Sequence, residues 1–145
     1  MKNLLYLRDD QIKDFIENLF YAYRETFNDP KKILEEYSLG IAHLKSLNLI
    51  SRYKGITISQ LLAKLKITKQ SLNRVLNDLE KIEIIFYEYD KKDSRVKHIF
   101  LKEKGINLSD KIFSEQKKRV YKALKNSNSE AVQNFDNIMT KIING

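Results

Sequence analysis

Residues 68–81 read TKQSLNRVLNDLEK and have the pattern of an amphipathic helix. The apolar residues that recur at helical spacing, and so share one face, are Leu72, Val75, Leu76 and Leu79. Thr68 is the natural N-cap of this helix. The opposite face begins with amides, a hydroxyl and a guanidinium, and no acidic residue precedes Asp78. Side chains of these types read base edges in a DNA groove, so the segment is either a groove-reading helix or an ordinary polar surface helix.

The residues immediately upstream predict a helix-turn-helix. SQLLAKLKI (residues 59–67) has the pattern of a short helix, and Ser59 is its expected N-cap. The tripeptide KIT leads from it directly into the helix at 68–81. Two short helices joined by such a tight turn form a helix-turn-helix.

The pattern changes from helix to strand after Lys81. Two β-rich runs, 84–89 and 96–101, flank the polar sequence DKKDSR, which predicts a hairpin. A charged hairpin that directly follows a helix-turn-helix is the wing of a winged helix. The dipeptide Ile56-Thr57 is expected to add a third strand at the edge of this sheet.

An apolar stripe marks a long helix near the start of the chain, from about residue 9 to residue 27. The stripe consists of Ile12, Phe15, Ile16, Leu19, Phe20, Tyr23 and Phe27. A short helical turn, PKKILEEY, follows, and Ser38 is expected to cap the next helix, which leads to Tyr53.

Two more helices are predicted after the wing. Gly105 is expected to open a long helix, and Ser129 is expected to cap the last one. The residues expected to point inward from the long helix are Leu108, Ile112, Phe113, Val120 and Leu124. The helices at both ends carry more apolar surface than one small module covers, so we expect them to form a homodimer interface. The predicted fold class is mainly α with a small β-hairpin wing.

The composition indicates one basic globular domain. The chain has 145 residues, with 27 Lys or Arg, 19 Asp or Glu and a formal charge of +8. A basic excess favours nucleic acid or anionic lipid as a partner. Residues 54–104 hold 12 basic and 7 acidic residues, so most of the excess lies in the predicted winged helix.

Several functional classes are excluded or disfavoured by what the sequence lacks. There is no cysteine, which excludes disulfides, zinc–cysteine sites and thiol redox sensing. No apolar run approaches the ~20 residues of a membrane span, and MKNLLYLRDDQ turns acidic too early for a signal peptide, so the cytoplasm is the expected location. The only two histidines, His43 and His98, have no second ligand at metal spacing, and no metal or cofactor is expected.

The stretches GITISQLLAKLKITKQSLNRVLNDLEKIEII and DKKDSRVKHIFLKEKG resemble the MarR family of bacterial transcriptional regulators. The most specific match is in the wing, where Asp93 and Arg95 fit the family's Asp-x-Arg pattern. LGIAHLKSLNLI and ITKQSLNRVL resemble the PetP-like branch of the family. The sequence departs from the family pattern at Lys102, which replaces a threonine, and at Glu83, where a glycine commonly ends the recognition helix.

The resemblance implies a homodimer that binds a pseudo-palindromic operator, usually as a repressor. It places the recognition helices in successive major grooves and the wings in flanking minor grooves. It also implies a single domain over 1–145, with dimerisation helices at 1–37 and 105–145 around a DNA-binding part at 38–104. Many family members release DNA when a small aromatic ligand enters a cleft between these parts.

Candidate site residues follow from the residue types and from this resemblance. The expected base contacts are Gln70, Ser71, Asn73 and Arg74. The expected phosphate contacts are Lys69, Lys91 and Lys92. Arg95 is expected to enter the minor groove, oriented by a salt bridge to Asp93. The alternative for the helix residues is an ordinary polar helix face. The alternative for the wing residues is a plain charged hairpin tip.

A possible ligand cleft is assigned to Tyr21, Tyr23 and His43, although His43 is equally compatible with a satisfied core histidine. An enzyme is disfavoured because the sequence has no Gly-rich phosphate loop, no nucleophile elbow and no histidine–carboxylate constellation. The remaining alternative is a winged-helix module that docks proteins without sequence-specific DNA binding.

Overall fold

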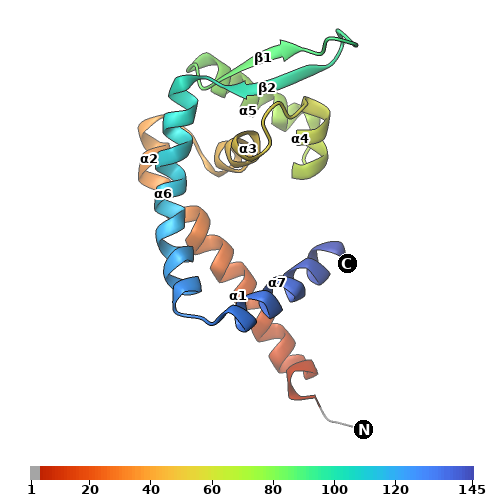
Figure 1. The fold of residues 1–145 in the computed structure, drawn as a ribbon, viewed down its shortest axis with the longest axis vertical. Coiled ribbons are helices and arrows are strands. Elements are labelled where there is room, and N and C mark those ends of the chain that lie inside the picture. Colours follow the sequence, from red (N-terminus) through yellow and green to blue (C-terminus); the bar gives the residue numbers. More distant parts are fainter. Residues whose placement is uncertain (1–3) are drawn as a thin grey trace.

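The computed structural model describes residues 4–145, in which the chain forms seven α-helices, a short 3-10 helix and one two-stranded antiparallel sheet (Figure 1). In chain order the elements are η1 (Leu5–Leu7), α1 (Asp9–Asn28), α2 (Lys31–Glu36), α3 (Ile41–Arg52), α4 (Ile58–Leu65), α5 (Lys69–Lys81), β1 (Ile85–Tyr89), β2 (Lys97–Leu101), α6 (Glu103–Lys125) and α7 (Ser129–Asn144). The predicted fold class, mainly α with a β-hairpin wing, is confirmed.

The molecule has two regions, which Figure 1 shows one above the other. The winged lobe (residues 31–112) contains α2 to α5, the hairpin and the first part of α6, and every buried Leu, Ile and Val of the described chain belongs to it. The terminal arms are α1, α6 beyond Ile112, and α7. No residue of α1 or α7, both of which lie wholly within the described part, is buried. No helix in residues 4–145 combines the length and the apolar composition needed to cross a membrane.

The helix-turn-helix consists of α4 and α5, and the buried face of α5 is the predicted one. Thr68 caps α5 as expected, its hydroxyl oxygen accepting the Ser71 N–H at 3.1 Å. The predicted cap of α4 is wrong. Thr57, not Ser59, precedes this helix, because Thr57 and Gln60 form a reciprocal pair: the Thr57 hydroxyl accepts the Gln60 N–H, and the Gln60 side chain accepts the Thr57 N–H.

Three other helix starts also differ from the predictions. Ser38 does not cap α3; it takes a left-handed conformation with φ of 56°, and the helix begins after Gly40. Asn128, not Ser129, caps α7, because its side-chain oxygen accepts the Ala131 N–H at 2.8 Å. The long helix α6 begins at Glu103, two residues before Gly105. Gly105 is needed for a different reason, since a side chain there would collide with the Ile84 carbonyl.

The hairpin forms close to its predicted limits, with Phe86 opposite Phe100 and Glu88 opposite His98. The predicted third strand is reduced to one isolated bridge, in which Thr57 pairs with His98. The Ile99 N–H also donates to the Ile56 carbonyl at 2.8 Å. The loop between α3 and α4 thus ties the middle of β2 to the rest of the winged lobe.

The inward face predicted for α6 is only half right. Leu108 and Ile112 are buried in the winged lobe, but Phe113, Val120 and Leu124 are exposed. The change occurs where α6 leaves the lobe and becomes an arm. The pattern identified an apolar face correctly, but in a single chain nothing covers its second half.

Candidate DNA-binding interface

The N-terminal half of α5 points into solvent. Lys69, Gln70, Ser71, Asn73 and Arg74 are all exposed, while the opposite face of the helix is buried. The Ser71 hydroxyl accepts a hydrogen bond from the Thr68 hydroxyl at 2.9 Å. This face therefore offers amide and guanidinium groups on a helix that is fixed from behind, which suits readout of base edges.

A histidine on α3 holds α5 in place. His43 Nδ1 accepts the Gly40 N–H at 3.0 Å, so the ring proton lies on Nε2, which contacts Asp78 Oδ2 at 2.9 Å. The bond joins α3 to the solvent side of α5, in addition to the apolar contacts below it. Of the two roles that the sequence left open for His43, the structure thus shows a histidine whose ring nitrogens are both hydrogen-bonded. The ring faces α5.

The two tyrosines assigned with His43 to a ligand cleft lie on α1 and have other neighbours. The Arg24 guanidinium lies over the Tyr21 ring, 4.8 Å from its centroid. Tyr23 packs against Phe27 and lies under the Lys45 ammonium group. The neighbouring Glu17 carboxylate raises the pKa of Tyr21.

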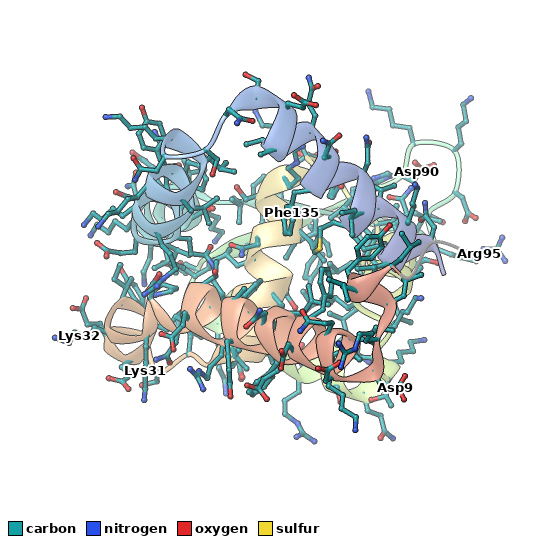
Figure 2. The ribbon with its side chains drawn as sticks, turned by 90° about the horizontal axis from the view of Figure 1, so that it is seen from below. Asp9, Lys31, Lys32, Asp90, Arg95 and Phe135 are labelled. Carbon is teal, nitrogen blue, oxygen red and sulfur yellow. The ribbon has the colours of Figure 1, made fainter. Side chains whose placement is uncertain are left out.

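The tip of the wing carries an arginine that projects away from the molecule (Figure 2). Arg95 is 89% exposed at its side chain and forms a two-pronged ion pair with Asp93, with N–O distances of 3.0 and 3.2 Å. Asp93 also accepts the Arg95 backbone N–H, and these bonds from Arg95 lower the pKa of the Asp93 carboxyl. The predicted ion pair is present. Lys91 and Lys92 are exposed beside it.

Where its strands lead into the tip, the wing contains a histidine–carboxylate pair, which the sequence analysis did not find. His98 Nε2 lies 2.8 Å from Asp90 Oδ1, and His98 Nδ1 lies 2.7 Å from the Gly55 carbonyl oxygen. The other oxygen of Asp90 accepts the N–H groups of Lys92 and Asp93. The Gly55 carbonyl and the Asp90 carboxylate raise the pKa of His98, and the bond from His98 is the main cause that lowers the pKa of Asp90. Only the hairpin register brings these residues together.

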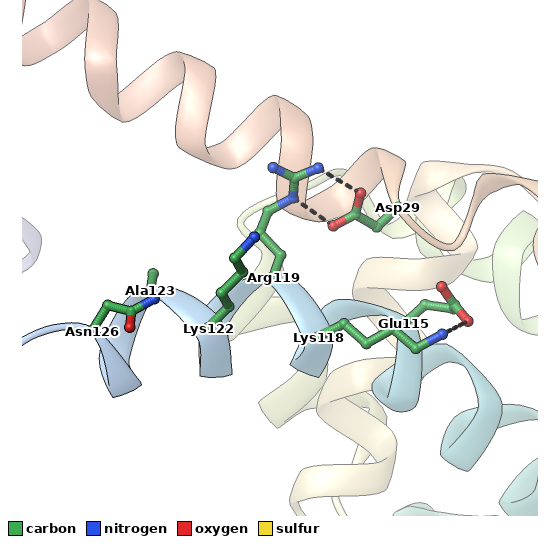
Figure 3. A pocket seen from close by; sticks show the side chains of 7 residues that line it. All are labelled: Asp29, Glu115, Lys118, Arg119, Lys122, Ala123 and Asn126. Carbon is green, nitrogen blue, oxygen red and sulfur yellow. Dashed lines mark hydrogen bonds and ion pairs between the residues drawn. The ribbon is translucent and has the colours of Figure 1, made fainter.

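Polar contacts join the α6 arm to the end of α1, and one of them also reaches α3 in the winged lobe. Arg119 on α6 donates to both carboxylate oxygens of Asp29, just after α1, at 2.7 and 3.0 Å (Figure 3). The bond lowers the pKa of Asp29 and raises that of Arg119. Gln116 accepts a hydrogen bond from Asn48 on α3 and donates one to the Thr26 carbonyl, both at 3.3 Å.

An open apolar groove of about 380 Å³ lies where α1, α3 and α6 meet. Phe27, Asn48, Gln116 and Val120 are among the residues that line it. The groove thus lies between the arms and the winged lobe, where the sequence analysis expected a ligand cleft. The residues assigned to that cleft, Tyr21, Tyr23 and His43, do not line the groove.

A helix-turn-helix with an exposed polar recognition face and a basic hairpin beside it defines a winged-helix DNA-binding protein. Known proteins identify the family. The family model described as MarR family matches residues 39–95. The HTH-type transcriptional regulator PetP of Rhodobacter capsulatus is 35% identical over 95% of this chain and 83% of its own length. The chain belongs to the MarR family of transcriptional regulators.

Solved structures share the whole architecture. A MarR transcriptional regulator from Methanosarcina mazei Go1 is 27% identical, with a TM-score of 0.71 over 91% of this chain and 96% of that one. Streptococcus pneumoniae FabT, solved in complex with DNA, has a TM-score of 0.75 at 20% identity over 94% of this chain and 96% of its own. S. aureus MepR in its DNA-binding conformation has a TM-score of 0.77 at 19% identity, over 91% and 96% of the two chains. The latter two are similar in fold alone.

Proposed function

We propose that the protein is a homodimeric regulator, a repressor in its usual mode, that binds a pseudo-palindromic DNA operator in the cytoplasm. The observation that carries this proposal is the outward face of α5, where Gln70, Asn73 and Arg74 are exposed on a helix whose other side is buried. Regulation by such a protein is non-covalent: occupancy of the operator changes access of RNA polymerase, and no cofactor takes part.

The base contacts assigned to α5 follow from hydrogen-bonding geometry. Gln70 is matched to adenine N6 and N7, and Arg74 to guanine O6 and N7, each pair contributing ~1–3 kcal/mol of discrimination. Asn73 and Ser71 lie on the same face and are assigned to neighbouring bases. Lys69 is assigned to a phosphate, which adds affinity without sequence information.

The wing is assigned to the adjacent minor groove. Arg95 projects from its tip and is held by Asp93, so a narrow A·T-rich groove with its concentrated negative potential suits it. Lys91 and Lys92 are assigned to the flanking phosphates.

The dimer interface is assigned to the arms, which lie within the segments 1–37 and 105–145 that the sequence analysis assigned to dimerisation, on either side of a DNA-binding part at 38–104. The exposed apolar side chains of the arms include Ile16, Phe20, Val120, Phe135, Ile138 and Ile142. Phe135 points from α7 toward the side on which α1 lies (Figure 2). A second copy, related by a two-fold axis, covers these faces and sets the two α5 helices about 34 Å apart.

A small aromatic effector is assigned to the apolar groove between α1, α3 and α6. A ligand there touches both an arm and the winged lobe, so it is able to change the spacing of the two recognition helices. Both ring nitrogens of His43 are already bonded, so the groove is a better site than the neighbourhood of His43.

Selection of bound duplexes from a random pool, followed by titration against salt, tests the proposed function. Operator binding predicts one recovered palindromic motif and a logarithmic slope of about −0.9 per neutralised phosphate. A flat salt response with no recovered motif would instead support the alternative, a winged-helix module that docks proteins.

A further inference from the structure

The wing holds, where its strands lead into the tip, a histidine whose two ring nitrogens both face hydrogen-bond acceptors. His98 Nδ1 is 2.7 Å from a backbone carbonyl oxygen, and Nε2 is 2.8 Å from a carboxylate oxygen. Neither partner donates. A neutral imidazole has one N–H and one lone pair, so only the doubly protonated ring makes both bonds.

His43 shows the opposite arrangement. Its Nδ1 accepts a backbone N–H, so the neutral ring with its proton on Nε2 makes both of its bonds. The chain has only these two histidines, and their partners demand different protonation states.

The bonds of His98 connect three segments that meet where the strands of the wing lead into its tip. Gly55 lies in the loop between α3 and α4, His98 lies on β2, and Asp90 follows β1. Asp90 then holds the backbone N–H groups of Lys92 and Asp93, and Asp93 holds Arg95. An unbroken series of bonds therefore runs from the winged lobe through the His98 ring to the arginine at the tip.

The charges that act on the pKa of the ring are both carboxylates, Asp90 and the cross-strand neighbour Glu88. The loop between α3 and α4 contributes the Gly55 carbonyl, which is the largest cause of the raised pKa of His98.

Charged groups on the other elements packed against β2 do not bond to the ring. Arg52 at the end of α3 is exposed, and Glu103 starts α6 beyond the far end of β2. On α4 the Lys64 ammonium group lies over the Tyr53 ring, 4.2 Å from its centroid. In the loop between α3 and α4, Lys54 lines a separate cavity.

We propose that His98 is a pH-sensitive anchor of the wing: its doubly protonated ring fixes the hairpin against the loop between α3 and α4, and loss of one proton releases the wing and weakens DNA binding. The DNA-binding part of this inference rests on the proposed function. The pKa of His98 is raised in the folded protein, so the anchoring is complete below the unfolded value of about 6.5 and is lost as the pH rises through the folded value.

Proton NMR of the untagged 145-residue protein tests the anchor without DNA. The two imidazole Cε1–H signals are followed from pH 5.5 to 9 together with the backbone amides of residues 91–97, and His98→Gln assigns the signals. We expect His98 to titrate above the ~6.5 of a free histidine, and the wing amides to shift with the same midpoint. A titration midpoint of His98 at or below that value would overturn the anchor. Wing amides whose shifts do not follow the His98 titration would also overturn it.

Asp90→Asn supplies a second test that preserves the turn, because the amide oxygen still accepts the N–H groups of Lys92 and Asp93. Removal of the carboxylate should move the titration midpoint of the His98 signal to lower pH. An unchanged midpoint would show that the pair does not hold the proton.

DNA affinity at constant ionic strength tests the consequence. From pH 6 to pH 8.5 the parent protein should bind a selected duplex about two- to fivefold more weakly, the range expected from a partly exposed ion pair. His98→Arg keeps a cation with several donors, so its affinity should stay nearly constant, and His98→Gln should bind weakly at both pH values. Equal pH slopes in all three proteins would overturn the coupling. Failure of the parent to bind DNA at any pH would contradict the proposed function, and the NMR experiment would still decide the anchor.

Discussion

The winged lobe and the terminal arms are both built from amphipathic helices, yet only the lobe buries its apolar faces within one chain. Leu44, Leu61, Leu79 and Ile99 are fully buried, and they come from three helices and a strand of the lobe. In the arms, by contrast, Phe20 is 56% exposed and Phe135 is 54% exposed. The difference teaches that a helical stripe in a sequence predicts which face is covered, but not whether the same chain covers it.

Truncation inside the lobe should have the largest effect. Leu79→Ala removes a fully buried side chain from the face that α5 packs against α3 and the sheet, so we expect a loss of about 2–5 kcal/mol in unfolding free energy. Urea unfolding followed by circular dichroism measures it. Leu124→Ala, the same change on an exposed arm position, is the matched control. An equal loss in the control at monomeric concentrations would erase the distinction between the two regions.

Disruption of the arms should change assembly more than folding. Phe135→Asp puts a charge on the apolar face of α7, and loss of an aromatic anchor at the centre of an interface costs about 2 kcal/mol or more. Sedimentation equilibrium should show a dimer dissociation constant raised at least ~30-fold. Tyr89→Ser removes a 63% exposed aromatic residue from the hairpin and should leave the dimer intact. A parent protein that sediments as a monomer would remove the basis of this prediction.

Much of the winged lobe could be predicted because its signals are local. The apolar period of α5, the threonine before it and the polar tip between two β-rich runs each lie within a few residues. The Asp93–Arg95 pair was predictable for the same reason, since both residues belong to one turn. The helix caps were harder, because Ser59 and Ser129 have suitable side chains but lie one or two residues too late in the backbone path.

The features that escaped prediction depend on register and on partners. Asp90 and His98 are eight positions apart, and only the pairing of β1 with β2 places them at bonding distance. No local pattern reports such a contact. The exposure of Phe113 and Val120 escaped prediction for another reason, because periodicity shows that a helix face is apolar but not whether the same chain covers it.

Within the lobe, the two DNA-facing elements should differ in what they contribute. Arg74→Ala removes the base contact proposed for α5 and should cost ~1–3 kcal/mol on the preferred operator while relaxing preference at one position. Lys92→Ala should weaken binding to all duplexes about equally and lower the salt slope by about one phosphate. Binding to a panel of single-base operator variants separates the two effects. Unchanged sequence preference in Arg74→Ala would refute the base contact assigned to α5.

The smallest effect concerns the junction between α5 and the wing. Glu83 adopts φ of 63°, in the left-handed region that costs a non-glycine residue about 1–2 kcal/mol. Its contact with Lys102 is long, 3.9 Å, and exposed, so it offsets little. Glu83→Gly should therefore raise the unfolding free energy by about 0.5–1 kcal/mol, after the larger chain entropy of glycine in the unfolded state is subtracted. Glu80→Gly, three residues earlier inside α5, should lower it by about 1 kcal/mol, since a helical position gains nothing from left-handed freedom. The same sign for both changes would mean that the backbone at Glu83 is unstrained, and that the junction is set by packing of the wing on the lobe.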